Sequence, residues 1–533
     1  MEFTGLLLFI YFFFVIIRIA NAQINCTIFA NDLDVINLNP FYVRLQFNSS
    51  FTSVYSSNYY WDSNNQIRVT YFNIFNDVNP SVNIYCLKKV ETLQLINTNL
   101  PILPDIKNFQ ELRSLIIRFD NGAIGTHLPS EFGQLKYLSI LELSNIQNLE
   151  DLPDDIEYLT SLSSLTLENI PNFSQIPDKS IGKLTNLQTL NLTDLPNLTT
   201  IPSSINNIQR LHKLEITRTR IKTLNLEKLK SLYYVVITFN SALETIDITN
   251  VASLSYMYVR NNNELLTLYV QNLYYLSVLD ILSNTKLVSV HIANVSCHST
   301  LSIADNPLLN TVILKNVSNL RTFKTNSSFN LKSISFENLP SLFNVSIRSA
   351  SYLETISFLN VPTMRYLDLT GCQLTMFPRS ILTLKSLISL NMQSNQLSTL
   401  PSTLSTDLPK LEVLYLGNNK LEGNIFHPTL FNIRELDLNN NLLTSMYGIG
   451  KYKSMEQLEL NYNNIALIPL EIMNLSKTLK TLRMNYNKLD YIPYQMANMR
   501  TLRSFSAMNN RISIDEQRNL FNIFSQSPIK FIF

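Results

Sequence analysis

Two segments near residue 400 repeat one pattern. Residues 387–397 read LISLNMQSNQL, and residues 411–421 read LEVLYLGNNKL. Both fit Leu-x-x-Leu-x-Leu-x-x-Asn-x-Leu, with Met392 in place of the third leucine of the first copy. Further copies follow at spacings of 22 to 24 residues, so the pattern is an internal repeat and not a chance match. The asparagines of successive copies are Asn395, Asn419, Asn441, Asn463, Asn487 and Asn510.

The middle of the chain carries a second strand signal in every repeat. Here the turn position recurs every 22 residues, and a second asparagine series with the same period runs between its members. Each member of this second series follows an apolar-x-apolar triplet such as residues 246–248, and such alternation is typical of β-strands. We therefore expect strands on both sides of each coil here, and extended or short 3-10 segments on the second side of the later coils. The turn asparagines are Asn240, Asn262, Asn284 and Asn306, and the second series is Asn250, Asn272, Asn294, Asn316, Asn338 and Asn360.

Residues 90–512 resemble the leucine-rich-repeat superfamily through this pattern. Copies with a Leu-Pro step, as at Leu400-Pro401, resemble the typical Leu-Pro subclass, and residues 125–138 resemble coils of plant-type extracellular receptors. The resemblance implies an α/β-type repeat solenoid, mostly β, with a parallel concave sheet of about 19 coils. It also implies that the turn asparagines are structural, because their side chains satisfy backbone groups where the chain leaves the strand. Where Cys372 takes the asparagine position, we expect a lost or weak bond and local irregularity.

The two ends of the repeat region are expected to be capped, because the end of a stack exposes core. Residues 1–22 read as a signal peptide, since a short apolar run precedes the small residues Ala20 and Ala22. Residues 23–89 do not repeat and read as an N-terminal cap. Residues 513–533 read as a C-terminal cap with a short helix that begins with a capping box. The apolar residues expected to cover the last coil are Leu520, Phe521 and Phe524.

The cysteines and sequons favour a secreted glycoprotein. Cys26 and Cys86 both lie in the N-terminal cap segment and are expected to form a disulfide bond. Cys297 and Cys372 belong to coils that lie roughly 14 Å apart at the stacking distance of strands, which is beyond disulfide reach. We therefore expect them to be free, buried thiols. The glycosylation candidates among the Asn-x-Ser/Thr sequons are Asn25, Asn48, Asn172, Asn197, Asn326 and Asn474.

The composition excludes several classes of function. The 533 residues include 42 basic and 40 acidic side chains, so bulk nucleic-acid binding has no electrostatic drive. Only 15% of residues are charged, which indicates a surface of uncharged polar residues, as in secreted proteins. No segment after the signal peptide is long and apolar enough to span a membrane. The sequence has no HExxH, CxxC or nucleotide-binding motif, so we expect no catalysis, no metal and no cofactor.

The candidate binding residues are the outward strand residues of the concave sheet. One strip combines tyrosine with arginine, a composition enriched at binding hot spots, although tyrosines on adjacent strands also form ordinary cross-strand pairs. A second strip combines charges of both signs with amides, which suits a protein or a glycan and equally suits a solvated face. The first strip is Tyr234, Tyr256, Tyr258 and Arg260, and the second is Asp437, Glu459, Asn461 and Arg483, flanked by Asn439, Gln457, Asn485, Tyr462 and Tyr486.

These observations predict a secreted, non-enzymatic protein, either free or associated with the cell surface. It is expected to bind a protein or a cell-surface or wall glycan through its concave face, with no membrane span in the mature chain. One alternative is a structural or adhesion component of the extracellular matrix or cell surface. Another is the ectodomain of a receptor without its membrane span. A cytosolic Ras-associated scaffold is a further alternative, against which the signal peptide and the N-terminal cysteines argue. The ligand and the oligomeric state stay open.

Overall fold

The chain folds into two compact units, residues 1–257 and 258–533. The sequence pattern predicted one repeat region across this boundary, which falls within β12 (Tyr256–Arg260). The predicted signal peptide, residues 1–22, lies outside the described residues. The computed structural model describes Ile24, Cys26, Asp32, Val35 and residues 55–61, 67–77, 80–119, 124–296, 299–426 and 432–532.

In the first unit, successive coils contribute one strand each to a parallel sheet, called here the main sheet. β1 and β2 pair in antiparallel orientation, and from β2 onward the strands pair in parallel with one register. Leu93, Leu115 and Leu141 therefore stand side by side and are buried. Because β2 is part of this ladder, the ladder begins within the segment predicted as a cap. The strands are β1 (Tyr55–Trp61), β2 (Ile67–Phe75), β3 (Thr92–Ile96), β4 (Ser114–Arg118), β5 (Ile140–Ser144), β6 (Ser164–Glu168), β7 (Thr189–Leu195), β8 (Lys213–Thr219) and β10 (Tyr234–Thr238).

Short helical turns close most coils of the first unit on the side opposite the main sheet. Several of them begin directly after a proline, such as Pro129 and Pro153, whose fixed φ suits the entry into a helical turn. Toward residue 257 these turns give way to two paired parallel strands. The elements are η3 (Val82–Cys86), η4 (Pro104–Asn108), η5 (Ser130–Gln134), η6 (Asp154–Tyr158), α4 (Asp178–Ile181), η7 (Ser203–Asn207), β9 (Thr223–Glu227) and β11 (Thr245–Thr249).

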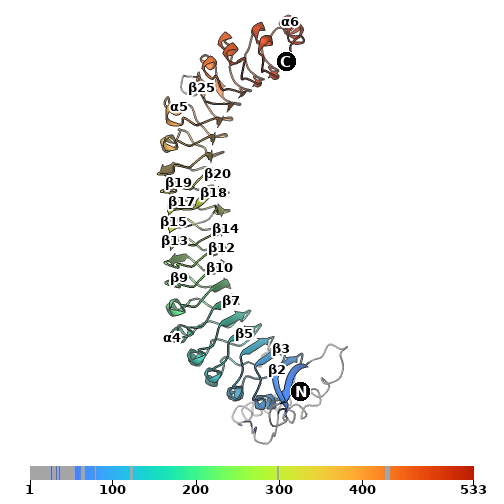
Figure 1. Ribbon diagram of the computed structural model, residues 1–533, viewed down its shortest axis with the longest axis vertical. Helices are drawn as coiled ribbons and strands as arrows, with labels where there is room; N and C mark the ends of the chain where they lie inside the picture. Colours follow the sequence, from blue (N-terminus) through green and yellow to red (C-terminus); the bar gives the residue numbers. More distant parts are fainter. Residues whose placement is uncertain are drawn as a thin grey trace, which may run out of the picture. The chain divides into compact units, whose positions relative to one another are not determined.

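The first coils of the second unit carry a strand on each side (Figure 1), which confirms the predicted second strand series. Apolar residues of both sheets point between them, and Val290 and Ile292 of β15 are almost fully buried. Each such side chain contributes about 1.5–3 kcal/mol of burial free energy. The main-sheet strands are β14 (Val278–Leu282), β16 (Ser299–Ala304), β18 (Leu320–Asn326) and β20 (Asn344–Ile347), and the second sheet is β13 (Thr267–Leu273), β15 (Ser289–Val295), β17 (Thr311–Val317), β19 (Ser333–Glu337) and β21 (Thr355–Leu359).

The later coils of the second unit have short main-sheet strands and helical turns on the second side. Most of these turns again follow a proline, such as Pro378 and Pro469. The main-sheet strands are β22 (Tyr366–Asp368), β23 (Ser389–Asn391), β24 (Val413–Tyr415), β26 (Glu435–Asp437), β28 (Gln457–Glu459), β29 (Thr481–Arg483), β30 (Ser504–Ser506) and β31 (Lys530–Ile532). The other elements are η8 (Arg379–Thr383), α5 (Leu404–Asp407), β25 (Glu422–Gly423), β27 (Leu442–Leu443), η9 (Ile449–Lys451), η10 (Leu470–Leu475), η11 (Tyr494–Asn498) and α6 (Ile514–Phe524).

In the later coils, turn asparagines satisfy buried backbone groups at the ends of the main-sheet strands that they follow. Asn395 donates from Nδ2 to the carbonyl oxygens of Leu369 and Met392, both at 2.9 Å, and its Oδ1 accepts from the Leu374 N–H at 2.9 Å. Leaving such groups unpaired would cost about 1–3 kcal/mol each. The same pattern of bonds recurs at Asn419, Asn441, Asn463, Asn487 and Asn510.

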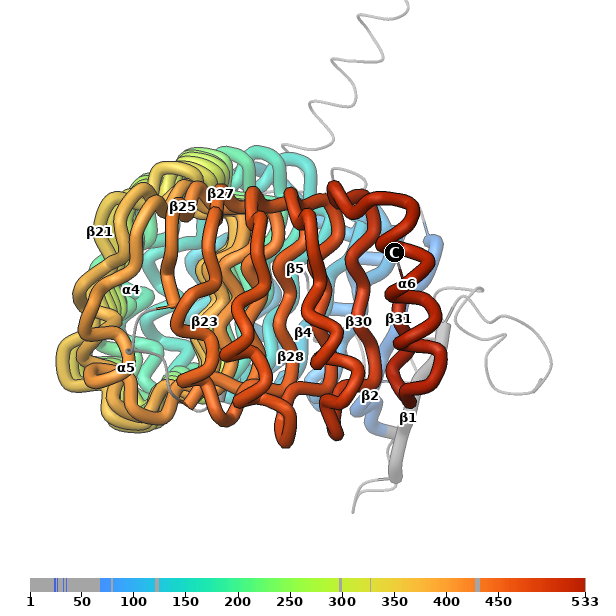
Figure 2. The backbone as a smooth tube through the Cα atoms, turned by 90° about the horizontal axis from the view of Figure 1, so that it is seen from above, coloured from blue at the N-terminus to red at the C-terminus, as the bar shows by residue number. Residues whose placement is uncertain are grey.

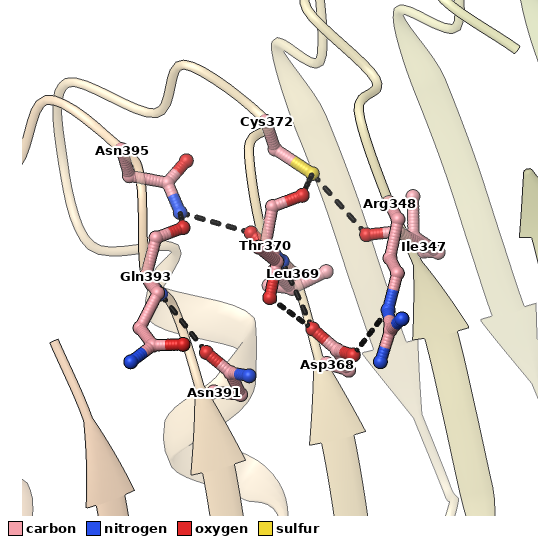
Figure 3. Close-up of polar contacts among 9 residues, drawn as sticks. All are labelled: Ile347, Arg348, Asp368, Leu369, Thr370, Cys372, Asn391, Gln393 and Asn395. Atoms are coloured by element: carbon pink, nitrogen blue, oxygen red, sulfur yellow. Dashed lines mark hydrogen bonds and ion pairs between the residues drawn. The ribbon is translucent and has the colours of Figure 1, made fainter. Parts of the chain in front are cut away.

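Cys372 takes over the same position without distorting the coil (Figure 3). Its thiol donates to the carbonyl oxygen of Ile347 at 3.3 Å, the counterpart of the Asn395 bond to Leu369. The bond is weak, as the sequence predicted, but the expected local irregularity is wrong, because β22 keeps its register with both neighbours. Burial raises the pKa of this thiol to about 12, so it stays protonated and inert.

A row of exposed asparagine side chains joins the coils of the two-sheet region. Asn294 donates from Nδ2 to Oδ1 of Asn272 at 2.9 Å, and Asn316 donates to Asn294 at 2.8 Å. Asn338 and Asn360 continue the row in the same way. Each of the five residues has a positive φ, a conformation that asparagine adopts more readily than most residues. From Asn272 to Asn360, the second asparagine series is therefore a hydrogen-bonded ladder.

The first and last described parts of the chain are stabilised in different ways. The predicted disulfide between Cys26 and Cys86 is present. At the other end, α6 lies beside β31 (Figure 2), with the rings of Phe524 and Phe531 4.4 Å apart. Leu520 and Phe524 are buried, but Phe521 is 64% exposed, so its predicted role in covering the last coil is wrong. The Ser513 hydroxyl caps α6 by accepting a hydrogen bond from the Glu516 N–H at 3.2 Å, as the predicted capping box requires.

Candidate functional site

The structure brings Tyr234 and Tyr256 together on the main sheet of the first unit. Their ring centroids lie 6.2 Å apart, and Tyr233, which the sequence pattern missed, packs edge-on against Tyr256 at 5.3 Å. The Lys213 ammonium lies 5.7 Å from the Tyr234 ring centroid. Tyr233 is 47% exposed although it contacts its neighbour. The three rings therefore form an ordered, partly exposed aromatic surface, called here the tyrosine cluster.

Tyr258 and Arg260 occupy the first strand of the second unit. The Arg260 guanidinium lies 5.0 Å from the Tyr258 ring centroid and also pairs with Asp280, with Nε 3.1 Å from Oδ2. The arginine predicted to contact a ligand is therefore held by the protein itself. A ligand at this position would meet a neutralised ion pair, not a free positive charge.

The second predicted strip lies on three adjacent strands of the second unit. Asp437, Glu459 and Arg483 face one another in register on β26, β28 and β29. Glu459 and Arg483 form an ion pair at 2.5 Å. Burial raises the pKa of the Glu459 carboxyl, the charge of Arg483 opposes this, and Asp437 adds to it. Like charges directly opposite on neighbouring strands are destabilising, so the Asp437–Glu459 pair needs other support.

Neutral donors support Asp437. The Gln393 amide reaches across one whole coil and donates to Oδ2 of Asp437 at 2.6 Å, and the Asn439 N–H donates to Oδ1 at 2.9 Å. This reach is possible because the intervening coil has Gly417, where a Cβ atom would lie only 3.2 Å from both carboxylate oxygens. Sequence reasoning missed Gln393, and the glycine in an otherwise bulky column was the signal that could have revealed it.

The amides beside these charges are fixed in one orientation. Oδ1 of Asn439 accepts from the Asn461 N–H at 2.7 Å, and Oδ1 of Asn461 accepts from the Asn485 N–H at 2.8 Å. Oδ1 of Asn485 accepts from the Met508 N–H at 2.8 Å. Nδ2 of Asn461 also donates to Oε2 of Glu459 at 3.4 Å, and the Asn439 side chain is hydrogen-bonded to the same carboxylate. Both ends of these two amides are therefore held within the protein, and each NH₂ group has one further N–H to donate.

Two tyrosines border the amides. The rings of Tyr462 and Tyr486 are stacked 4.3 Å apart with an interplanar angle of 8°. They are 49% and 45% exposed, and both have positive φ values, 56° and 57°. A bulky residue is rare in this backbone conformation. The structure thus places an exposed pair of stacked aromatic residues next to the second strip.

A charge ladder next to this strip was not among the predicted residues. Arg434 bridges Glu412 at 3.5 Å and Glu456 at 2.8 Å, and Lys480 contacts Glu456 at 2.6 Å. Hydrogen bonds from Lys480 and Arg434 lower the pKa of the Glu456 carboxyl. These charges pair with one another from coil to coil, so the ladder leaves little unpaired charge for a ligand.

The glycosylation candidates differ in their surroundings. Asn197 and Asn474 are exposed, whereas Nδ2 of the exposed Asn172 donates to the Gln147 carbonyl oxygen at 2.9 Å. Asn25 and Asn48 lie outside the described residues, as does the side chain of Asn326.

Within the part of the chain that the structure describes, no group of three or more His, Cys, Asp or Glu side chains could hold a metal ion. Among the described helices, none is both long enough and apolar enough to cross a membrane.

Comparisons with known proteins give a consistent picture of the repeat. Residues 362–421 match the model of the leucine rich repeat family. An uncharacterized leucine-rich repeat-containing protein of Schizosaccharomyces pombe is 36% identical over 98 residues, which are 18% of this chain. The match spans only 16% of the length of that relative.

The solved structures to which the chain is similar include one from Leptospira interrogans and one from Arabidopsis. A leucine-rich-repeat protein of Leptospira interrogans is 22% identical, with 86% of this chain and 93% of that chain covered and a TM-score of 0.28. The Arabidopsis receptor kinase HAESA, solved with the peptide hormone IDA and the co-receptor SERK1, is 21% identical. That similarity covers 83% of this chain and 78% of the receptor chain, with a TM-score of 0.33.

Proposed function

The chain is a leucine-rich-repeat protein, and on this premise we propose that it is a secreted, glycosylated binding protein without catalytic activity. Its ligand is another macromolecule, bound by the concave face that the main sheet presents. The observation that carries the proposal is the tyrosine cluster of the first unit.

The tyrosine cluster has the properties of a binding hot spot. Tyrosine combines a large apolar ring with a polar hydroxyl and is enriched among residues that dominate binding energy. Tyr233, Tyr234 and Tyr256 hold one another through ring contacts. Little side-chain entropy is therefore lost when a ligand docks, and preorganisation of this kind increases affinity.

Secretion is tested by locating the protein. The full chain with a C-terminal tag is expressed in a eukaryotic host and sought in medium, membranes and cytosol, before and after N-glycosidase treatment. We expect soluble protein in the medium whose mobility shifts on treatment. Unshifted cytosolic protein would contradict the proposal and favour the scaffold alternative.

Binding is tested with a double variant, Tyr233→Ser with Tyr256→Ser. Wild type and variant are compared against a panel of purified extracellular proteins and glycans, and we expect at least about a tenfold loss of affinity for the bound partner. Tyr158→Ser is the matched control, because Tyr158 is 56% exposed on the opposite side of its coil. Equal binding by the double variant and the control would contradict the role of the cluster.

The structural or adhesion alternative is favoured by the asparagine ladder, which joins successive coils of the two-sheet region. A structural component would bind no partner through the main sheet. It would instead lose assembly when the ladder is broken, for example by Asn316→Ala.

A further inference from the structure

We propose that a neutral glycan binds to one face of the second unit, on the strands β26, β28 and β29. The inference rests on the proposed function and names the ligand class and its place. The face consists of three side chains from each of three successive coils and is called here the planar grid. Its members are Asp437, Asn439 and Asn440, then Glu459, Asn461 and Tyr462, then Arg483, Asn485 and Tyr486.

The planar grid is built by the repeat itself. The first member of each coil ends a main-sheet strand, and these three residues lie in register on adjacent strands. The second and third members follow in the turn toward the buried asparagine. Corresponding side chains therefore recur at about the strand spacing of 4.7–4.9 Å. A chain-like ligand that runs across the strands would meet the same kinds of group at each step.

Every member of the planar grid has a planar polar group, which is a carboxylate, a carboxamide, a guanidinium or a phenol. Carboxylates, carboxamides and guanidinium groups offer paired hydrogen-bonding atoms, and such pairs match the adjacent hydroxyl groups of a sugar ring. The amides of Asn439, Asn461 and Asn485 are already oriented, because each Oδ1 accepts a backbone N–H of the next coil. Asn439 and Asn461 also bond to the Glu459 carboxylate, so each of these two NH₂ groups has one further N–H for a ligand.

The charges of the planar grid favour a neutral ligand over a strongly charged one. Glu459 and Arg483 neutralise each other, and Asp437 is held by the Gln393 amide and the Asn439 N–H. The neighbouring charge ladder is also paired within itself. An anionic partner would find the Arg483 charge already paired, and a cationic partner would find both carboxylates already bonded.

The stacked tyrosines supply the apolar part of the site. Each ring covers one face of its neighbour, and both rings still expose nearly half of their surface. The apolar C–H face of a sugar ring packs on exposed aromatic rings of this kind. Where neighbouring coils have no ring, the same backbone position is occupied by Asn418, Asn440 and Asn509.

The backbone conformation of Tyr462 and Tyr486 belongs to the repeat, because the same turn has a positive φ at residues as different as Phe239, Ser394 and Asn440. Both have the left-handed backbone conformation, which asparagine tolerates far better than tyrosine. Neither ring is buried in the core. The turn therefore does not require a tyrosine, and the two exposed rings are available for a ligand.

The test uses the double variant Tyr462→Asn with Tyr486→Asn in the full chain. It gives both positions the residue found in the adjacent coils, so the fold is preserved and the melting temperature is unchanged or raised. Binding is measured against an array of short neutral oligosaccharides, glucans, mannans and galactans, and then in solution with the best binder. We expect wild-type binding and at least about a tenfold loss in the variant.

Phe239→Asn is the matched control, because Phe239 has the same conformation with φ 59° and is 51% exposed in the first unit. It should leave glycan binding unchanged. Three results would overturn the inference: no oligosaccharide binds the wild type, the double variant binds as well as the wild type, or a lysine- and arginine-rich peptide binds this face in preference. If only the Tyr233 and Tyr256 variant loses glycan binding, the proposed function stands and the planar grid is the wrong place.

Discussion

Two regions of the second unit use the same turn residue in different ways. In residues 258–361, Oδ1 of the turn asparagine accepts from the N–H of the turn residue one coil earlier, as Asn284 does from Asn262 at 3.0 Å. In residues 362–512, Oδ1 accepts from the residue that lies two positions after the turn residue of the preceding coil. Asn419 accepts in this way from the Leu397 N–H at 3.0 Å. Asn262 and Asn284 are completely buried, whereas Asn419 is 8% exposed.

The difference follows from the backbone around the turn. In the later coils the turn N–H is already used, since the Asn419 N–H donates to the Asn440 carbonyl oxygen at 3.2 Å. The side-chain oxygen is then available to the next unpaired N–H. One residue type thus supports coils with a second strand and coils with a helical turn, because its amide has both donors and an acceptor.

The largest expected effect on the free energy of unfolding comes from a substitution in the core of the two-sheet region. Phe336 is fully buried between Phe323, at 5.3 Å, and Phe358, at 5.1 Å. Phe336→Ala should lower the free energy of unfolding by about 3–5 kcal/mol, because it removes a large ring and leaves a cavity. Urea denaturation measures the loss. Phe329→Ala is the control, since Phe329 is 49% exposed and should cost less than about 0.5 kcal/mol.

The next effect compares the two kinds of turn. Asn284→Ala should cost about 3 kcal/mol, because the buried Val259 carbonyl and Asn262 N–H lose their partner where water cannot reach them. Asn419→Ala should cost about 2 kcal/mol, because its turn lies closer to solvent. Urea denaturation of both variants beside the exposed Asn263→Ala gives the comparison. Equal losses at Asn284 and Asn419 would show that burial does not separate the two turns.

A smaller effect concerns the coil between the two regions. Cys372→Asn should raise the free energy of unfolding by about 1 kcal/mol, because a full amide replaces a weak thiol donor at the Ile347 carbonyl. Cys372→Ala, which removes the donor altogether, is the paired variant and should lower it by a similar amount. A lower denaturation midpoint for Cys372→Asn than for wild type would mean that this turn is not shaped for an amide.

The smallest effect is a pH dependence with opposite signs at two glutamates of the later coils. The folded pKa of Glu456 is lowered, so its contribution to stability is present above its unfolded pKa and is lost as pH falls. The folded pKa of Glu459 is raised, so its charged form is penalised at neutral pH and the penalty disappears as pH falls. Urea midpoints between about pH 3 and 7 should therefore fall less steeply on acidification for Glu456→Gln and more steeply for Glu459→Gln. Parallel profiles would contradict the opposite shifts.

The repeat register and the two strand series were predictable because they depend on periodic apolar residues that stack on their counterparts. The side-chain contacts between strands of the main sheet were less predictable from the sequence. Gln393 reaches Asp437 only because Gly417 has no side chain between them, and Tyr233 joins the tyrosine cluster from outside its strand. Such contacts depend on the sizes of neighbours from other coils, which a period does not encode. The prediction for Phe521 was wrong because the side of α6 that carries this residue faces away from the last coil.

The asparagine ladder has a direction. From Asn294 to Asn360, every side-chain amide donates to the asparagine of the preceding coil, and from Asn294 to Asn338 each also accepts from the following one. The amide dipoles are therefore aligned head to tail, and aligned hydrogen bonds polarise one another. The row therefore has a net dipole, as a helix does, with its negative end at Asn360. Asn360 lies beside the coil where the second strand ends and the helical turns resume.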